Sequence, residues 1–371
     1  MRRVLSPALS AVGLIGFTLL LLRFPAQSTQ AARDGVTLCA DLILPSLFPF
    51  FVLSSLFIEL GLAVIPGRFL RRVMGPLFGL SGPCAAPLLL GAVGGYPVGI
   101  RTAASLVREG QCSPTELRRL SAFCNNCGPA FLFSVAGVGV FSSSKAGFLL
   151  LGTHLTAAFL VGVGFHLFDR ATPPPPPRKG NGVTFPSFSS VFPDCVRNAF
   201  SSTLNVCAFV ILFSVLIALA ESAGLLQGAE HLLAGIFPQA PPALFRSLLI
   251  GVFEISTGVC SLQEAATYPL ALPVAAFLLG WGGFSVHCQS LPYLHESKAD
   301  LKPYFIGKFL QGILAALLTG AVLPFLSLST NSAVEAMATL SPSFSLLKQE
   351  SLALWALAGL FFVFTRKKGW K

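Results

Sequence analysis

The sequence of 371 residues has few charged side chains. Aspartate, glutamate, lysine and arginine make up 11% of it and hydrophobic residues 54%, whereas soluble domains average about 25% charged residues. No stretch is long and polar enough to form a separate soluble domain. Apolar runs of roughly 20 residues, the length that crosses a bilayer, recur from end to end. The chain is therefore predicted to be an all-α polytopic membrane protein.

The sequence also lacks the patterns that carry common enzyme chemistry. It contains no recognisable pair of nucleophile and base, no phosphate-binding loop and no cluster of metal ligands on a soluble face. The stretch CNNC at 124–127 has the C-x-x-C spacing of zinc and thiol redox sites, but no second pair follows it. Buried cysteines usually behave as small hydrophobic residues. We therefore expect neither an enzyme nor a bound cofactor.

The apolar runs and their charged flanks predict about eight transmembrane helices. These spans run over 5–22, 38–62, 120–141, 146–168, 198–221, 270–291, 305–326 and 351–365. The N-terminal stretch also resembles a signal peptide, because basic residues precede an apolar core. Arg23 abuts this core where a cleavage region would be neutral, so we interpret the segment as a retained helix.

Basic residues indicate the orientation of these helices, because short cytoplasmic loops collect lysine and arginine. With the N-terminus in the cytoplasm, 20 of the 25 basic residues fall on the cytoplasmic side, and Lys308 is counted among them. Both termini are then cytoplasmic. This bias and anionic lipid account for the net charge of +10 without a nucleic-acid partner.

Two further apolar segments, 77–100 and 243–266, are interrupted near their middle by glycine, proline, serine or threonine. Backbone that leaves a helix at membrane depth must be buried in protein or line a wet cavity, because each unsatisfied polar group facing lipid costs several kcal/mol. We therefore interpret the two segments as re-entrant hairpins that mark the interior of the protein.

The chain repeats itself at an offset near 154 to 160 residues; for example, LLLGAVGG at 88–95 resembles SLLIGVFE at 247–254. Each unit contains three spans and one hairpin, so the second copy is predicted to be inverted relative to the first. The predicted parts are a first helix and outer loop (1–37), repeat 1 (38–168), a proline-rich cytoplasmic linker (169–194), repeat 2 (195–328), and an outer loop, last helix and basic tail (329–371).

Inverted repeats with paired broken segments are typical of secondary transporters, whose substrate lies near the midplane between the copies. Broken helices expose half-helix N-termini, which hold anions through free N–H groups. The predicted substrate-binding residues are Gly95, Tyr96, Pro97, Gly99, Arg101, Asn125, Asn126, Gly128, Pro129, Ser256, Thr257, Gly282, Gly283, Ser285 and His287. Alternatively, the small residues among them serve only close helix packing, and Arg101 is an ordinary cytoplasmic loop residue.

Glu254 is an acidic residue inside the second hairpin. Charges within the membrane are expensive and are therefore functional candidates. We expect Glu254 to bind a coupling cation, either sodium or a proton, unless it lies in an outer vestibule.

The stretches GGYPVGIRTAASLVREG and ELRRLSAFCNNCGPAFLFSVAGVGVF resemble the YlbJ (SpoVV) family of sporulation integral membrane proteins. Its pattern joins a Gly-Tyr-Pro-x-Gly hairpin to a helix with Asn-Asn-x-Gly-Pro, and the resemblance covers roughly residues 38–328. Cys127 fills a variable place in the pattern where serine is expected. The family carries the nucleoside-recognition or gate domain and is similar in architecture to concentrative nucleoside transporters.

The resemblance implies a role in endospore formation, in which dipicolinic acid moves from the mother cell across the outer forespore membrane. A small aromatic dianion suits a pocket of helix N-termini and amides. Two alternatives remain open: a transporter of nucleosides or other small solutes, and a membrane scaffold that transports nothing. The expected partners are the small anion, the lipid bilayer, and either a second copy of the chain or other sporulation membrane proteins.

Overall fold

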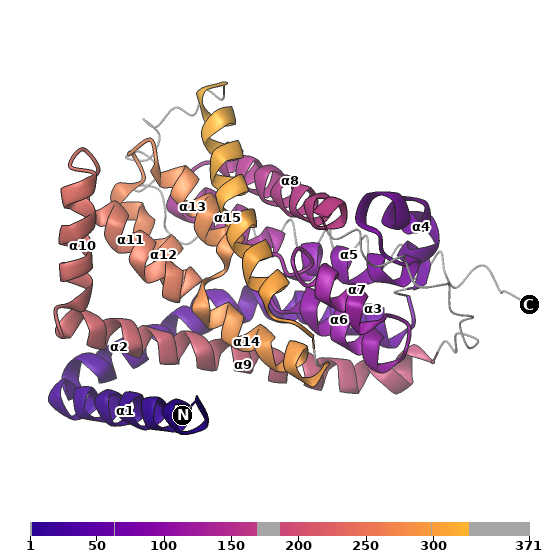
Figure 1. Ribbon diagram of the computed structural model, residues 1–371, viewed down its shortest axis with the longest axis horizontal. Helices are drawn as coiled ribbons and strands as arrows, with labels where there is room; N and C mark the ends of the chain where they lie inside the picture. The colour runs from indigo at the N-terminus through magenta and orange to yellow at the C-terminus, as the bar shows by residue number, and fades with distance from the viewer. Residues whose placement is uncertain (1, 63, 169–185, 298, 326–371) are drawn as a thin grey trace, which may run out of the picture. The chain divides into compact units, whose positions relative to one another are not determined.

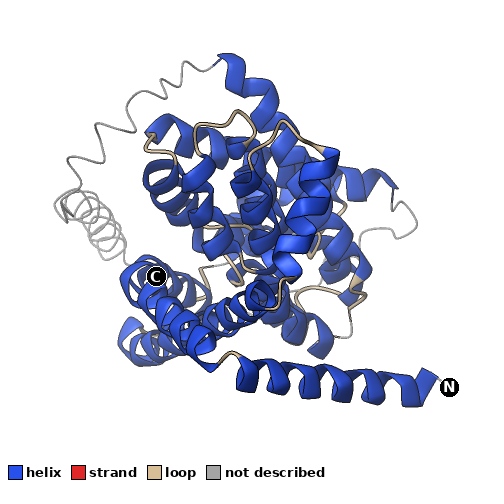
Figure 2. Ribbon diagram, turned by 90° about the vertical axis from the view of Figure 1, so that its left-hand side faces the viewer, coloured by secondary structure: helices blue, strands red, loops and turns tan. Residues whose placement is uncertain are grey.

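The computed structural model describes residues 2–62, 64–168, 186–297 and 299–325. In these ranges the regular elements are all helices, and Figure 2 shows them joined by loops. The prediction of an all-α fold is confirmed. The predicted last span, 351–365, and most of the predicted linker lie outside the described residues.

The first half of the chain consists of helices of very different lengths (Figure 1). They are α1 (Arg2–Arg23), α2 (Pro25–Leu38), the π-helix η1 (Cys39–Ile43), α3 (Leu44–Glu59), α4 (Val64–Phe78), the 3-10 helix η2 (Gly82–Cys84), α5 (Ala85–Gly94), α6 (Val98–Arg108), α7 (Pro114–Leu120), the π-helix η3 (Phe131–Val140) and α8 (Ser144–Phe168).

The second half contains the longest helix of the described chain. Its elements are α9 (Phe188–Ser222), α10 (Leu225–Ile236), α11 (Pro242–Phe253), α12 (Ile255–Ser261), the 3-10 helix η4 (Leu262–Ala265), α13 (Ala271–Trp281), α14 (Gly283–Glu296), α15 (Lys302–Val322) and the 3-10 helix η5 (Leu323–Phe325). α9 begins within the range predicted as linker, so the end of that range is helical.

Four helical segments of the described chain are long and apolar enough to cross a membrane. They are Ser144–Phe168, Phe188–Ser222, Ala271–Glu296 and Lys302–Phe325, and each overlaps one of the predicted spans. The number rises to six if two sharply bent pairs are each one span. One pair bends by 98° between α1 and α2, and the other by 85° between α4 and α5.

Helices from the two halves share one hydrophobic core. α8 of the first half contacts α13 and α15 of the second, and the three lie side by side in Figure 1. Leu150 and Leu278 are completely buried in this core. α13 and α15 approach closely at Gly280 and Gly312, which have no side chains to keep the helices apart. A Cβ atom at Gly280 would lie only 2.6 Å from the Cα atom of Gly312. The core thereby holds both halves in a single compact unit.

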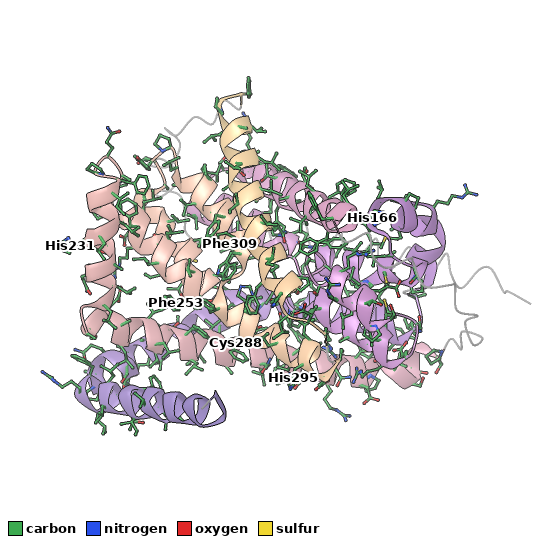
Figure 3. All side chains as sticks on the ribbon, viewed as in Figure 1. His166, His231, Phe253, Cys288, His295 and Phe309 are labelled. Carbon is green, nitrogen blue, oxygen red and sulfur yellow. The ribbon has the colours of Figure 1, made fainter. Side chains whose placement is uncertain are left out.

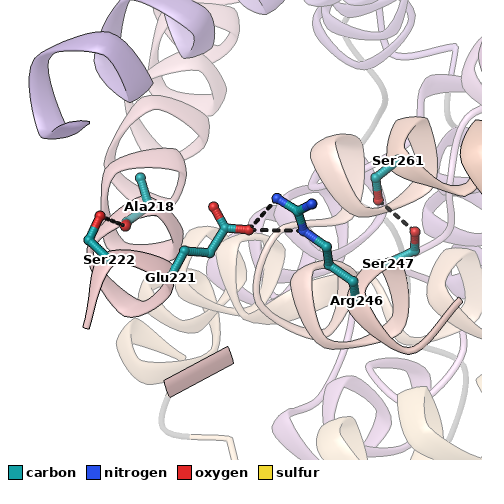
Figure 4. Close-up of polar contacts among 6 residues, drawn as sticks. All are labelled: Ala218, Glu221, Ser222, Arg246, Ser247 and Ser261. Atoms are coloured by element: carbon teal, nitrogen blue, oxygen red, sulfur yellow. Dashed lines mark hydrogen bonds and ion pairs between the residues drawn. The ribbon is translucent and has the colours of Figure 1, made fainter. Parts of the chain in front are cut away.

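Polar side chains fix the second hairpin to its neighbours, as Figure 4 shows. Arg246 on α11 donates two hydrogen bonds, of 3.0 and 2.7 Å, to one carboxylate oxygen of Glu221 near the end of α9. Within the hairpin, the Ser261 hydroxyl donates to the Ser247 hydroxyl at 2.9 Å. These contacts set the position of α11 and α12 relative to α9.

Candidate functional site

The helical backbone is interrupted at four places within apolar segments. Two interruptions lie in the hairpins, at 95–97 between α5 and α6 and at Glu254 between α11 and α12. The other two lie in the helices that follow, at 124–128 and at Gly282. Gly95 and Gly282 have φ angles of 79° and 92°, in the region that favours glycine. The backbone therefore changes direction at the places where the sequence predicts breaks.

In each half, the hairpin break packs against the break that follows it. A Cβ atom at Gly95 would lie 3.0 Å from the backbone nitrogen of Gly128. In the second half, a Cβ atom at Gly283 would lie 3.1 Å from the backbone nitrogen of Ile255, next to Glu254. Such distances are tighter than most contacts of real Cβ atoms, and both glycines have positive φ angles, so glycine is strongly favoured at both positions. In each half, the two breaks thus form a closely packed pair.

Tyr96 connects the two pairs. Its side chain is 8% exposed, and its hydroxyl donates a hydrogen bond to the Leu279 carbonyl oxygen. A Cβ atom at Gly282 would lie 3.4 Å from the Tyr96 ring. Tyr96 therefore joins the hairpin tip of the first half to the helix break of the second half.

A small cavity of about 50 Å³ lies among the breaks. Its lining residues come from both halves: Ile43, Leu47, Gly95, Tyr96, Cys127, Gly128, Phe131, Val206, Val210, Glu254, Ile255, Ser256, Ser285, Val286 and Gln289. The Ser285 hydroxyl and the Gln289 Oε1 atom are buried and have no hydrogen-bond partner among the described residues. Buried polar groups normally have hydrogen-bond partners, so these two atoms indicate that the cavity can bind a polar ligand.

Glu254 is the charged side chain in the wall of this central cavity, and it is completely buried. Its carboxylate accepts hydrogen bonds from the backbone N–H groups of Ser256 at 3.0 Å and Thr257 at 2.6 Å. Glu254 thus acts as the N-cap of α12. The N–H groups predicted to bind an anion at this break are bonded to a carboxylate of the chain itself.

A larger cavity of about 390 Å³ adjoins the central one, because Gln289 lines both. Pro97, Arg101 and Glu296 contribute to its wall. The Arg101 guanidinium is half-buried and donates to the Ser202 hydroxyl at 2.7 Å. This volume falls in the usual range of about 300 to 1,000 Å³ for small-molecule pockets, whereas the central cavity is much smaller.

Asn125 and Asn126 form hydrogen bonds with neighbouring helices. The Asn125 amide donates to the Ser290 hydroxyl at 3.0 Å. The Asn126 amide donates to the Phe123 carbonyl oxygen at 3.0 Å, and its Oδ1 atom accepts from Gln311 at 2.8 Å. Both asparagines are buried. They hold the unwound segment 124–128 against α14 and α15.

Lys308 and Gln311 on α15 complete this network. The Lys308 ammonium donates to the Asn125 backbone carbonyl oxygen and to Gln311 Oε1, each at 2.7 Å. On the other side, the backbone N–H of Cys127 donates to His154 Nε2 at 3.1 Å. Lys308 is completely buried, so it does not lie in a solvated loop of the kind that the positive-inside count describes.

Aromatic side chains surround the break at Gly282. The ring centroid of Trp281 lies 4.2 Å from that of His287 and 6.2 Å from that of Phe309. The Phe284 ring contacts both Trp281 and Phe253. Figure 3 labels Phe253 and Phe309 on α11 and α15. His287 Nδ1 shares a hydrogen bond of 2.9 Å with the Tyr304 hydroxyl, so one nitrogen of this predicted site residue already has a partner.

The predicted site residues therefore fall into distinct groups. The central cavity is lined by Gly95, Tyr96, Gly128, Glu254, Ser256 and Ser285, and the larger cavity is lined by Pro97 and Arg101. Packing or bonding around the breaks involves Gly99, Asn125, Asn126, Thr257, Gly282, Gly283 and His287. Pro129 is half-buried beside Gly128.

Sequence reasoning missed Gln289, Lys308, Gln311 and His154. Lys308 stands close to a predicted helix end, where a lysine ordinarily extends its charge toward the interface. The other three are polar residues within apolar runs, and candidates were selected from the sequence at predicted helix breaks. A polar stripe on one face of a predicted span is the signal that points to them.

Cys124 and Cys127 do not belong to a group of possible metal ligands. Within the described ranges, the one such group consists of Cys84, Cys112 and Glu116. Burial raises the pKa of Glu116, but hydrogen bonds from Ser81 and Ser113 outweigh it, so its pKa lies below the usual value. Glu116 is the N3 residue of the capping box of α7, whose N-cap is Ser113, and it also accepts a hydrogen bond from the backbone N–H of Ser81.

We expect Tyr96→Phe to lower the stability of the protein by about 1 kcal/mol, because it removes a buried hydrogen bond between the halves and leaves the ring in place. Thermal unfolding of the purified protein in detergent measures this loss. Tyr268→Phe is the matched control, because the Tyr268 hydroxyl makes a long bond of 3.4 Å at the surface. Equal unfolding temperatures for the two variants would contradict the bridging role of Tyr96.

Comparison with known proteins places this architecture in a family. The family model described as Gate: Nucleoside recognition matches residues 42–161, which include the first hairpin and the segment 124–128. The chain is 31% identical over 320 residues to the sporulation integral membrane protein YlbJ of Bacillus subtilis (strain 168), covering 81% of this chain and 78% of that protein. No solved structure matches significantly. These matches and the apolar helices show that the chain is an integral membrane protein and belongs to the YlbJ family of sporulation integral membrane proteins.

Proposed function

We propose that the protein is a secondary-type transporter, not an enzyme, and that it moves dipicolinic acid into the developing forespore. One observation carries this proposal: three backbone breaks from the two halves and the first turn of α14, which follows the fourth break, line a small cavity that shares Gln289 with a larger one. Broken helices that meet at membrane depth are the usual construction of substrate sites in secondary transporters. The family resemblance supplies the substrate and the outer forespore membrane as the location.

The paired packing of the breaks supports inverted repeats. In the first half, Gly95 packs against the backbone of Gly128. In the second half, Gly283 packs against the backbone of 253–255, and the two contacts are related by about the offset of the sequence repeat. With three crossings in each repeat, the two hairpins enter the membrane from opposite sides. Alternating access then requires only that one half move relative to the other around the central cavity.

Arg101 provides the charge that an anion needs on entry. The larger cavity has the volume for a small aromatic dianion, and Arg101 offers donors in the fork geometry that suits a carboxylate. The central cavity is too small for such a solute in this conformation, so passage requires it to widen. Glu254 in its wall is the candidate for the coupling cation or proton, which would neutralise the carboxylate before an anion enters.

Ligand-induced stabilisation of the purified protein tests the choice of substrate. A ligand at 100 times its dissociation constant stabilises the folded state by about 2.7 kcal/mol. We expect dipicolinate to raise the unfolding temperature and isophthalate, a dianion of similar shape without the ring nitrogen, to raise it less. Uridine tests the alternative that the gate-domain match favours, a nucleoside transporter. Stabilisation by uridine and not by dipicolinate would replace the proposed substrate.

We expect Arg101→Gln to weaken dipicolinate binding about tenfold or more, because a hydrogen bond to a charged group contributes about 1.5 to 3 kcal/mol. Titration of the purified variant measures this change. Arg197→Gln is the control, since Arg197 is an exposed arginine paired with Asp194. If both variants bind dipicolinate as the wild type does, Arg101 does not contact the solute.

A further inference from the structure

Lys308 is a charged side chain with no exposed surface, on a helix that is long and apolar enough to span the membrane. No carboxylate lies within ion-pair distance of it in the part of the chain that the structure describes. A charge in such a place is costly and is usually retained for a function. The transport pathway proposed above does not use Lys308, because it lines neither cavity.

The surroundings of Lys308 are those of a bound cation. An ammonium group has three donors and no acceptor. Two of its contacts are the Asn125 backbone carbonyl oxygen and the Gln311 amide oxygen, at 2.7 Å each. The third is the face of the Tyr96 ring, whose centroid lies 5.2 Å from Nζ. Every partner is electron-rich, so the site favours a positively charged group.

One of these partners belongs to the unwound segment 124–128. Carbonyl oxygens freed by unwinding are the groups with which broken helices coordinate sodium ions in secondary transporters. Here the Asn125 carbonyl oxygen already accepts a hydrogen bond from Lys308. Gln311 extends the contact to Asn126, so the lysine organises both asparagines of the break.

We propose that the Lys308 ammonium is a built-in cation that holds the segment 124–128 in place of a bound metal ion, so that the first half of the protein needs no sodium. This inference deepens the proposed function and rests on it for its meaning in transport. Glu254 in the second half remains the place for a coupling cation or proton. Tyr96 lines the central cavity, and its ring lies between this cavity and the Lys308 ammonium group.

Hydrogen exchange of the segment 121–130 in the full-length protein tests the proposal without any transport assay. In the wild type, we expect residues 121–126, which do not line the cavity of Glu254, to exchange equally in sodium chloride and in choline chloride of the same ionic strength. We expect Lys308→Ala to speed exchange in this segment about tenfold or more, because the carbonyl groups lose their cation. Lys302→Ala, at an exposed lysine in the first turn of the same helix, is the control.

Addition of n-propylammonium chloride provides a rescue, because this ion replaces the atoms that alanine lacks. We expect it to restore slow exchange in Lys308→Ala, whereas tetramethylammonium, which has charge but no N–H donor, does not. Unchanged exchange in Lys308→Ala overturns the proposal, and so does failure of the rescue. If this variant cannot be purified, sodium-induced protection of 121–126 in the wild type still overturns it. A protein that passes these tests but does not bind dipicolinate disproves the proposed substrate alone.

Discussion

Gly99→Ala is expected to prevent the protein from folding, with a loss of about 3 kcal/mol or more, because the new methyl group has no space. A Cβ atom at Gly99 would lie 2.8 Å from the Cys124 carbonyl carbon, closer still to its oxygen, and 3.1 Å from the Cα atom of Gly91. All three neighbours are backbone atoms, which cannot turn away as a flexible side chain can. The hairpin of α5 and α6 and the segment 124–128 would have to separate.

The yield of monodisperse protein in size-exclusion chromatography and its unfolding temperature measure this effect. Gly152→Ala is the matched control, because a Cβ atom at Gly152 on α8 meets nothing within 4 Å. Alanine there should leave stability within about 1 kcal/mol of the wild type. A Gly99→Ala protein with the yield and unfolding temperature of the control would show that the hairpin and the segment 124–128 are not packed as described.

Asn126→Ala is expected to abolish transport and to lower stability by about 1 to 3 kcal/mol. Asn126 is 2% exposed and makes two hydrogen bonds, to the Phe123 carbonyl oxygen and from Gln311. Its loss leaves both partners buried without their bonds at the point where the backbone is unwound. Asn198→Ala, at an exposed asparagine on α9, should change neither property.

A double-mutant cycle separates the contact from other effects of the substitution. Because Asn126 and Gln311 bond to each other at 2.8 Å, the loss in Asn126→Ala with Gln311→Ala should be smaller than the sum of the single losses. The measurement is again the unfolding temperature in detergent. Additive losses would mean that the two amides do not depend on each other.

Local sequence signals predicted where the helices break but not what the breaks contact. Glycine, proline and paired asparagine interrupt apolar runs for reasons that are visible in a few residues. The long apolar runs of α8, α9 and α15 are equally visible. The partners are different. Tyr96 meets Leu279 and Lys308 meets Asn125 across more than 180 residues, and no local pattern encodes such pairings.

Charged residues were the least predictable part of the site. A lysine near a helix end reads as an interfacial residue because its long stem normally carries the charge to water. Lys308 instead turns inward, because unwound backbone offers it carbonyl oxygens. Glu254 was expected to be available to an ion, yet it also caps its own helix. In both cases, backbone groups freed by a nearby break determine what the side chain binds.

Counterflow of labelled dipicolinate into proteoliposomes tests the central claim of transport most directly. Vesicles that contain the wild-type protein and are loaded with unlabelled dipicolinate should accumulate the label well above the level of protein-free vesicles. Vesicles with an equal amount of Asn198→Ala should do the same, and those with Asn126→Ala should not. Folded wild-type protein that gives no more flux than empty vesicles would contradict transport and favour a membrane scaffold.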